Sequence, residues 1–477
     1  MPTVLCGAQR CWRACIISVA AAMLQIPAAG WAQTASPAPA PIRAAPAPPP
    51  TEARPDGFSL SGSLRFRIEA LDDQFRPELD PSASAIFLRT TLAGQYRAGP
   101  VRLSAELIDA RAYRLAGRNI ISANDVNTVE LSQAFVGFDL GHAAPNAGDV
   151  SIDIGRFTMD LGSRRLVGRN MFRNAVNSFT GVRAHATAFH GLALTAFATL
   201  PHNRLPSDRA GIDDNRVAFD RESTALILWG VFGARSRVIG RTTLEAYLIG
   251  LHERDASGFP TRDRQLYTAG VRLLSEPRPG QTDFEIEGVY QTGSASRTTA
   301  ASDRPIPVSA WFLHAEIGHQ FAARWQPRVS ARIDIASGDR AGARYTRFDT
   351  LFGVRRLDFG PTGLFGPLGR NNIISPGVKL DVTPDKRWDG FIAYRAALLE
   401  SATDSFSSTG IRDPSGRSGR FAGHQIEARA RYWMVPQRLR VDVGAATLIN
   451  GEFLQRAANA NRRGNPLYGY VDLTVTF

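Results

Sequence analysis

One stretch decides the fold: Phe58–Ala70, which reads FSLSGSLRFRIEA. Its thirteen residues alternate without a break between apolar or small residues and polar ones. Because successive side chains of a strand point to opposite faces, the stretch predicts a strand with one apolar face and one polar face. Soluble strands average about 5–6 residues, whereas a tilted strand needs about 9–11 residues to cross a bilayer. The length therefore favours a membrane-spanning strand.

The end of the chain repeats this pattern. Leu467–Phe477 reads LYGYVDLTVTF, and from Val471 onward apolar and polar residues alternate up to the terminal aromatic residue. Alone, this segment fits the last strand of a soluble sandwich equally well. Beside the first strand, it predicts a barrel whose last strand pairs with its first and leaves no free edge.

Sixteen further alternating segments lie between these two, which gives eighteen predicted strands. The segments with the weakest alternation are Val150–Arg156 and Asn372–Val382. Predicted connections alternate between short turns, such as Ala98–Pro100, and long loops, such as Asp109–Thr128 and Ser337–Asn371. An even strand number, short periplasmic turns and long extracellular loops are typical of bacterial outer-membrane barrels. The predicted fold is thus an all-β transmembrane antiparallel β-barrel of about eighteen strands over residues 57–477.

The amino terminus predicts secretion. Arg10 and Arg13 precede a mostly apolar run, and small residues at Gly30 and Ala32 suit cleavage after Ala32, so residues 1–32 are predicted to be a signal peptide. Residues 33–56 are rich in Pro and Ala and predict a disordered leader. All three cysteines precede the cleavage site, which excludes disulfides in the mature protein. The net charge of +12 falls to about +10 when the two signal arginines are removed.

The polar face of the strands is strongly charged. If the apolar face contacts lipid, the opposite face of each strand points into the barrel. That inward face carries many acids and a set of arginines that includes Arg65, Arg67, Arg183, Arg332, Arg395, Arg429 and Arg431. Burying so many unpaired charges in a dry core is prohibitive, so the pattern predicts an aqueous lumen. Most of these charges could simply pair across strands and support the wall. As a set, basic residues in a water-filled lumen favour anion selectivity, because arginine binds carboxylates through two N–H groups.

No motif indicates catalysis or a cofactor. We find no phosphate-binding glycine loop and no metal-binding helix motif, so we expect no cofactor and no metal. The alternation places His185 and His314 on the inward face of their strands, but neither has an evident serine partner in the sequence. A membrane-embedded hydrolase stays an alternative to the favoured non-enzyme, because triad residues need not be neighbours in sequence. Asp72-Asp73 and Asp213-Asp214 offer oxygen ligands for calcium, although solvated loop acids are favoured.

The sequence resembles the alginate export family of outer-membrane porins across Phe58–Phe477. The segments that carry the resemblance are Gly155–Phe157, Arg169–Asn174, Phe179–Arg183, Ala336–Asp339, Phe348–Gly353, Asp413–Gly416 and Phe421–Glu427. The resemblance implies a monomeric eighteen-stranded channel that carries an anionic polysaccharide outward, narrowed by arginines and acids and gated by an extracellular loop and a periplasmic turn. It also implies that Arg156 and Arg183 are constriction residues. Two features depart from the family pattern: Phe157 replaces an expected polar residue, and Arg156 has the opposite parity to Asp153.

These observations predict a channel in the cell outer membrane that exports an anionic polysaccharide such as alginate. The predicted substrate-binding residues are Arg65, Arg67, Arg156, Arg183, Arg332, Arg395, Arg429 and Arg431. An uptake porin for anionic oligosaccharides or small organic acids is the main alternative, and a barrel enzyme or an adhesin with large loops is a further one. Expected partners are outer-membrane lipid, the barrel-assembly machinery through the strand ending in Phe477, and periplasmic export proteins, with no nucleic acid.

Overall fold

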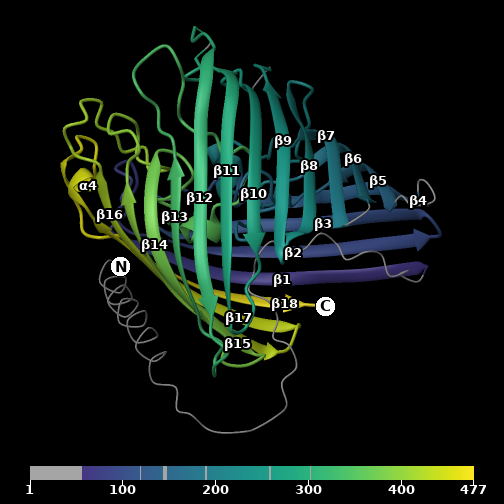
Figure 1. Ribbon diagram of the computed structural model, residues 1–477. Helices are drawn as coiled ribbons and strands as arrows, with labels where there is room; N and C mark the ends of the chain where they lie inside the picture. Colours follow the sequence, from purple (N-terminus) through teal and green to yellow (C-terminus); the bar gives the residue numbers. More distant parts are fainter. Residues whose placement is uncertain (1–55, 119, 143–147, 189–190, 257–258, 301) are drawn as a thin grey trace. The chain divides into compact units, whose positions relative to one another are not determined.

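The computed structural model describes residues 56–118, 120–142, 148–188, 191–256, 259–300 and 302–477 (Figure 1). The predicted signal peptide and all of the leader except Asp56 lie outside the described residues, as does His190. Among the described residues, no helix combines the length and apolar content needed to cross a membrane.

Eighteen antiparallel strands form one closed sheet in the described part of the chain. Each strand pairs with its sequence neighbours, and β18 pairs with β1. The strands are β1 (Gly57–Asp72), β2 (Ala83–Ala98), β3 (Val101–Ala116), β4 (Asn127–His142), β5 (Asp149–Phe157), β6 (Phe179–Ala188), β7 (Leu192–Pro201), β8 (Leu226–Ile239), β9 (Thr242–Glu253), β10 (Gln265–Ser275), β11 (Gln281–Ala295), β12 (Ile306–Gln320), β13 (Arg328–Ala336), β14 (Ile373–Val382), β15 (Trp388–Leu398), β16 (Phe421–Val435), β17 (Leu439–Asn450) and β18 (Leu467–Thr476). The predicted barrel is confirmed, including the two weakest strand segments, which form β5 and β14.

The two ends of the barrel domain close the sheet as the sequence predicts. Ser63 lies opposite Thr476, and the register continues to Asp72 opposite Leu467. The Gly62 N–H donates to the Phe477 carbonyl at 2.9 Å, and the Phe477 N–H donates back at 3.1 Å. A Cβ atom at Gly62 would lie 2.5 Å from the Phe477 ring, so glycine leaves the space that the terminal aromatic side chain occupies.

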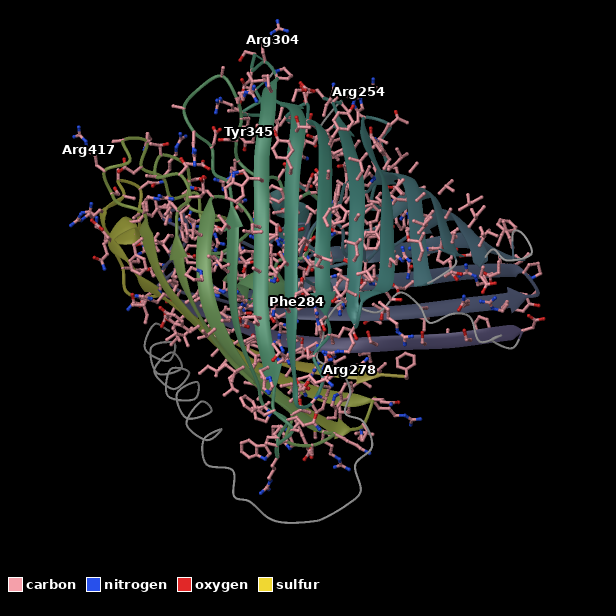
Figure 2. All side chains as sticks on the ribbon, in the orientation of Figure 1. Arg254, Arg278, Phe284, Arg304, Tyr345 and Arg417 are labelled. Atoms are coloured by element: carbon pink, nitrogen blue, oxygen red, sulfur yellow. The ribbon has the colours of Figure 1, made fainter. Side chains whose placement is uncertain are left out.

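Long and short connections alternate around the barrel. The nine long ones are 73–82, 117–126, 158–178, 202–225, 254–264, 296–305, 337–372, 399–420 and 451–466. They contain the short helices α2 (Arg209–Asp213), α3 (Arg356–Phe359) and α4 (Glu452–Arg456). In Figure 2, Arg254, Arg304 and Arg417 mark the long-loop end, and Arg278 marks the short-turn end.

The prediction of a loop over Asp109–Thr128 is wrong in its bounds, because strand β3 continues to Ala116. The extended strand is stabilised by a side chain from a distant loop: the Asn215 amide accepts from Ala112 N at 2.8 Å and donates to Ala112 O at 3.0 Å. Such a contact, between residues 103 positions apart, leaves no local signal in the sequence.

The two faces of the strands differ as the alternation predicts. On β1, Leu64 and Phe66 are 49% and 40% exposed, whereas Arg65 and Arg67 are 5% and 4% exposed. The apolar side chains form the outer surface and the charged ones face inward. This confirms the predicted parity of the strands.

The parity gives a stability prediction for β17. Val443 lies opposite Val471, which is 39% exposed on the outer face. Val443→Arg should reduce the free energy of folding into liposomes by roughly 2–4 kcal/mol, because it places a cation on the lipid face near mid-membrane. Leu439→Arg, on the same face at the strand end, is the matched control and should cost about 0–1 kcal/mol. Equal losses in urea titrations of the two variants would contradict this placement.

Candidate functional site

Loop 158–178 enters the barrel and is held there by arginines of β1 and β2. Arg65 donates to the carbonyls of Met171, Phe172 and Arg173 at 2.9–3.3 Å and to the Asn174 side chain at 2.8 Å. Two neighbouring arginines share these acceptors: Arg67 donates to Phe172 O at 2.8 Å, and Arg89 donates to Met171 O at 3.0 Å. Charged donors on backbone carbonyls make strong hydrogen bonds, so this side of the loop is firmly anchored.

A second long loop, 337–372, pairs with the first inside the barrel. Val167 and Phe352 form a parallel β-bridge. The Phe352 N–H donates to Leu166 O at 2.9 Å, and the Val354 N–H donates to Arg164 O at 2.9 Å. These backbone bonds make the two loops a single unit, which we call the lumen ribbon, defined as residues 158–178 and 337–372.

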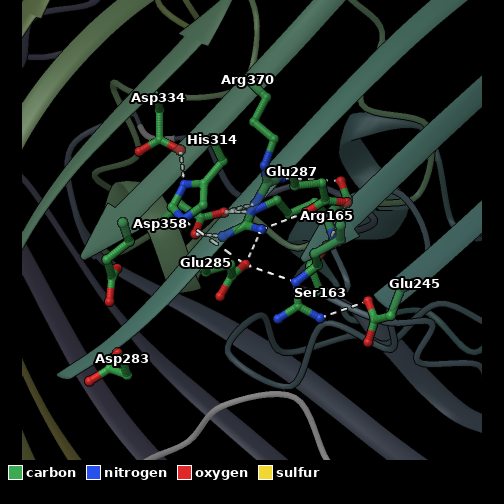
Figure 3. Close-up of polar contacts among 12 residues, drawn as sticks. Ser163, Arg165, Glu245, Asp283, Glu285, Glu287, His314, Asp334, Asp358 and Arg370 are labelled. Carbon is green, nitrogen blue, oxygen red and sulfur yellow. Dashed lines mark hydrogen bonds and ion pairs between the residues drawn. The ribbon is translucent and has the colours of Figure 1, made fainter. Parts of the chain in front are cut away.

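The far wall of the barrel holds the lumen ribbon through acids (Figure 3). Arg165 forms ion pairs of 2.5 Å with both Glu285 and Glu287 on β11 and donates two hydrogen bonds of 3.0 Å to Asp358 of the second loop. Arg370 also pairs with Asp358. Burial raises the pKa of Asp358, but the two arginines outweigh it and hold that pKa well below its usual range. The ribbon therefore spans the lumen from β1 to β11.

Further wall residues fix the second loop. Glu69 of β1 accepts from Leu364 N at 2.9 Å, and Glu427 of β16 pairs with Arg356 at 2.6 Å. Arg395 of β15 donates to the Asp358 carbonyl. Phe172 of the first loop packs under Arg67, whose Cζ lies 4.1 Å from the ring centroid.

One group within the described residues brings a histidine and two acids close together: His314, Asp334 and Asp358. Asp334 accepts from His314 Nδ1 at 2.7 Å. Asp358 already binds Arg165 and Arg370, and the charges of these two arginines oppose a metal cation. The group is therefore best suited to hold the second loop in place.

The predicted arginines divide by what they contact. Arg65, Arg67 and Arg395 are buried, and most of their N–H groups bind the lumen ribbon or wall acids. They position the ribbon, a role that parity does not reveal.

Four predicted arginines lie on the inner wall. Arg183 pairs with Asp153 at 2.6 Å, donates to Thr158 O of the lumen ribbon at 3.1 Å, and has its Cζ 4.7 Å from the ring centroid of Phe157. Arg429 and Arg431 share Asp389, each at 2.6 Å. Arg332, which is half-buried, lies opposite Glu316. Their direct contact with substrate stays a prediction.

Arg156 pairs with other acids than the remaining predicted arginines do. Its guanidinium pairs with Glu130 at 2.6 Å and with Glu222 of loop 202–225 at 2.8 Å. Burial raises the pKa of Glu222, but hydrogen bonds from Thr180 and Arg156 outweigh it and lower that pKa to about 2. Arg156 and Arg183, predicted together, therefore belong to separate clusters: Arg156 ties down loop 202–225, and Arg183 lies on the inner wall.

The alternation of the strands did not identify the charged residues of the lumen ribbon, among them Arg164, Arg165, Arg169, Arg173, Arg355, Arg356, Asp358 and Arg370. Loops have no alternation, so inward direction cannot be read from them. The density of arginine in residues 163–174 (SRRLVGRNMFRN) and in Arg355-Arg356 was the available signal.

The alginate export family matches residues 57–465, which is nearly the whole barrel. The chain belongs to the alginate export family. No curated protein matches it.

Solved outer-membrane proteins of Pseudomonas aeruginosa share the fold of this alginate export family chain. OpdQ matches with a TM-score of 0.56 and 13% identity, covering 88% of this chain and 97% of its own. OccK8 (OprE) matches with a TM-score of 0.57 and 12% identity, covering 88% and 98%. OccK2 (OpdF), in a structure in complex with glucuronate, matches with a TM-score of 0.53 and 13% identity, covering 88% and 100%. The protein is an outer-membrane channel, as predicted.

Proposed function

We propose that this channel passes an anionic polysaccharide of the alginate type, or its oligomers, out of the cell. The observation that carries the proposal is the combination of wall arginines, Arg183, Arg332, Arg429 and Arg431, with the arginines of the lumen ribbon. A polyuronate has one carboxylate per sugar, so its carboxylates can pass from one arginine to the next without any single site binding the chain too tightly. The outward direction is supported by the family to which the chain belongs.

A second candidate function is uptake of anionic oligosaccharides or small acids. It is favoured by the likeness to OccK2 (OpdF), which was solved in complex with the sugar acid glucuronate. Both functions need the same anion path, and they differ in the direction of flow. Terminal residue Phe477, which completes the β1–β18 closure, remains our candidate for recognition by the barrel-assembly machinery.

Single-channel recording tests the proposed substrate. Uronate oligomers added to one side of a planar bilayer should produce brief, voltage-dependent blockages of the current. Neutral oligosaccharides of equal length should produce none, because they lack the carboxylates that bind arginine. Equal blockage by the two classes would contradict an anion path, and a larger on-rate from the short-turn side would favour export.

A further inference from the structure

The inner wall near the short turns carries two aromatic rings with cations over them. Arg440 of β17 lies opposite Trp433 of β16, with its Cζ 5.5 Å from the indole centroid. Phe391 of β15 has Lys379 Nζ at 4.4 Å and Arg429 Cζ at 4.9 Å from its ring centroid. Both rings are half-buried. Cations and aromatic faces thus alternate along this surface.

Wall acids partly balance these cations: Asp442 lies opposite Arg431, and the carboxylates of Asp442 and Asp472 attract Arg440. Arg429 and Arg431 share the single carboxylate of Asp389. Among the described residues, no hydrogen-bond partner reaches the buried Nε of Arg429 or that of Arg440. Within the described part of the chain, the Arg440 guanidinium donates one long hydrogen bond, of 3.5 Å, to the Thr474 hydroxyl. An incoming carboxylate would bind the solvent-exposed part of these guanidinium groups, not the buried Nε atoms.

The position and spacing of the rings suit an extended sugar chain. Phe391 is in register with Arg429, which precedes Trp433 by four residues on β16. At about 3.3 Å per residue, the two aromatic positions are about 13 Å apart. Side chains near the two rings are partly exposed to solvent: the side chain of Arg429 is 15% exposed and that of Asp389 is 22% exposed. The Trp433 indole offers a flat apolar face to the C–H face of a sugar, while the arginines bind its carboxylates. Phe391 lies between Lys379 and Arg429 and positions these two cations.

We propose that this surface is a binding track for oligomeric sugar acids at the short-turn mouth of the channel, made by Phe391, Arg429, Arg431, Trp433 and Arg440. The track rests on the proposed function and specifies where an oligouronate first contacts the protein from the periplasmic side. Sugar stacking on Trp433 and the positioning of Lys379 and Arg429 by Phe391 explain why aromatic residues interrupt a charged inner face at these two positions.

Tryptophan emission tests the track directly, because Trp433 is on the inner face. Trp311 and Trp388 are exposed on the outer surface, Trp325 is exposed in the short turn between β12 and β13, and Trp229 is half-buried on β8. Trigalacturonate titrated into the mature protein in detergent should change the emission saturably. Arg440→Gln should weaken the affinity about tenfold, as expected for loss of a charged hydrogen bond. Trp433→Phe should abolish the change, and the matched control Trp388→Phe should retain it.

Several outcomes overturn the track. These are no saturable change in the wild type, an equal change with neutral cellotriose, an equal change with acetate at matched ionic strength, or a change that survives in Trp433→Phe. Arg440→Gln keeps Trp433 as reporter, so the track is testable even if Trp433→Phe does not fold. Current blockage by uronate oligomers with no Trp433 response would refute the track and leave the proposed function standing.

Discussion

Arg165→Ala should release the lumen ribbon and enlarge the open channel. Arg165 is 5% exposed and neutralises Glu285, Glu287 and Asp358, so its removal leaves three buried acids with one fewer cation. Breaking a buried charge network in this way costs about 3–5 kcal/mol. We expect a higher single-channel conductance, faster proteolysis within 158–178 and 337–372, and a lower unfolding midpoint.

The matched control is Arg209→Ala. Arg209 also pairs with an acid, Asp213, but the two side chains are 47% and 32% exposed. Such surface pairs contribute about 0–1 kcal/mol, so conductance and midpoint should match the wild type. Unchanged conductance and proteolysis in Arg165→Ala would show that the ribbon does not depend on this arginine.

The Arg165 effect should also depend on pH. The pKa of Asp358 is depressed in the folded protein, so its contribution to stability is present at neutral pH and is lost as the pH falls below the ordinary aspartate range. The difference in midpoint between wild type and Arg165→Ala should therefore shrink in acid. A difference that grows on acidification would contradict the ion-pair explanation.

Charge reversal on the inner wall should change which ions the channel passes. The double variant Arg429→Glu and Arg431→Glu replaces two cations that share Asp389 with two further acids. Inside a low-dielectric wall the field of these charges is focused on the pore, so we expect a shift of the reversal potential toward cation preference. The shift should be largest at low salt, because salt screens the interaction.

Arg209→Glu with Arg216→Glu is the matched control for the charge reversal. It makes the same change in net charge on loop 202–225, where the two side chains are 47% and 54% exposed. Its reversal potential should stay close to that of the wild type. Equal shifts in the two double variants would mean that net charge alone, and not the inner wall, sets selectivity.

The sequence was informative wherever a residue's direction follows from its position in a strand. Leu64 and Arg65 separate onto two faces because a strand alternates, and the pairing of β18 with β1 follows from the two alternating segments at either end of the barrel domain. For this reason the strand number, the parity and the order of long and short connections could all be predicted.

The path of the lumen ribbon could not be predicted from strand alternation. Arg65 contacts Asn174, 109 residues away, and Arg165 contacts Asp358, 193 residues away. Such contacts depend on how loops return into the barrel, and no local pattern encodes that path. The same limit explains why Arg156 was grouped with Arg183: both follow family motifs, but Glu222 of a distant loop binds only the first.

The reversal potential of the wild-type channel under a salt gradient tests the central claim most directly. If the arginines of the inner wall and the lumen ribbon form an anion path, the sign of the potential should show anion preference, and raising the salt on both sides should weaken it. Cation preference at low salt would contradict the account.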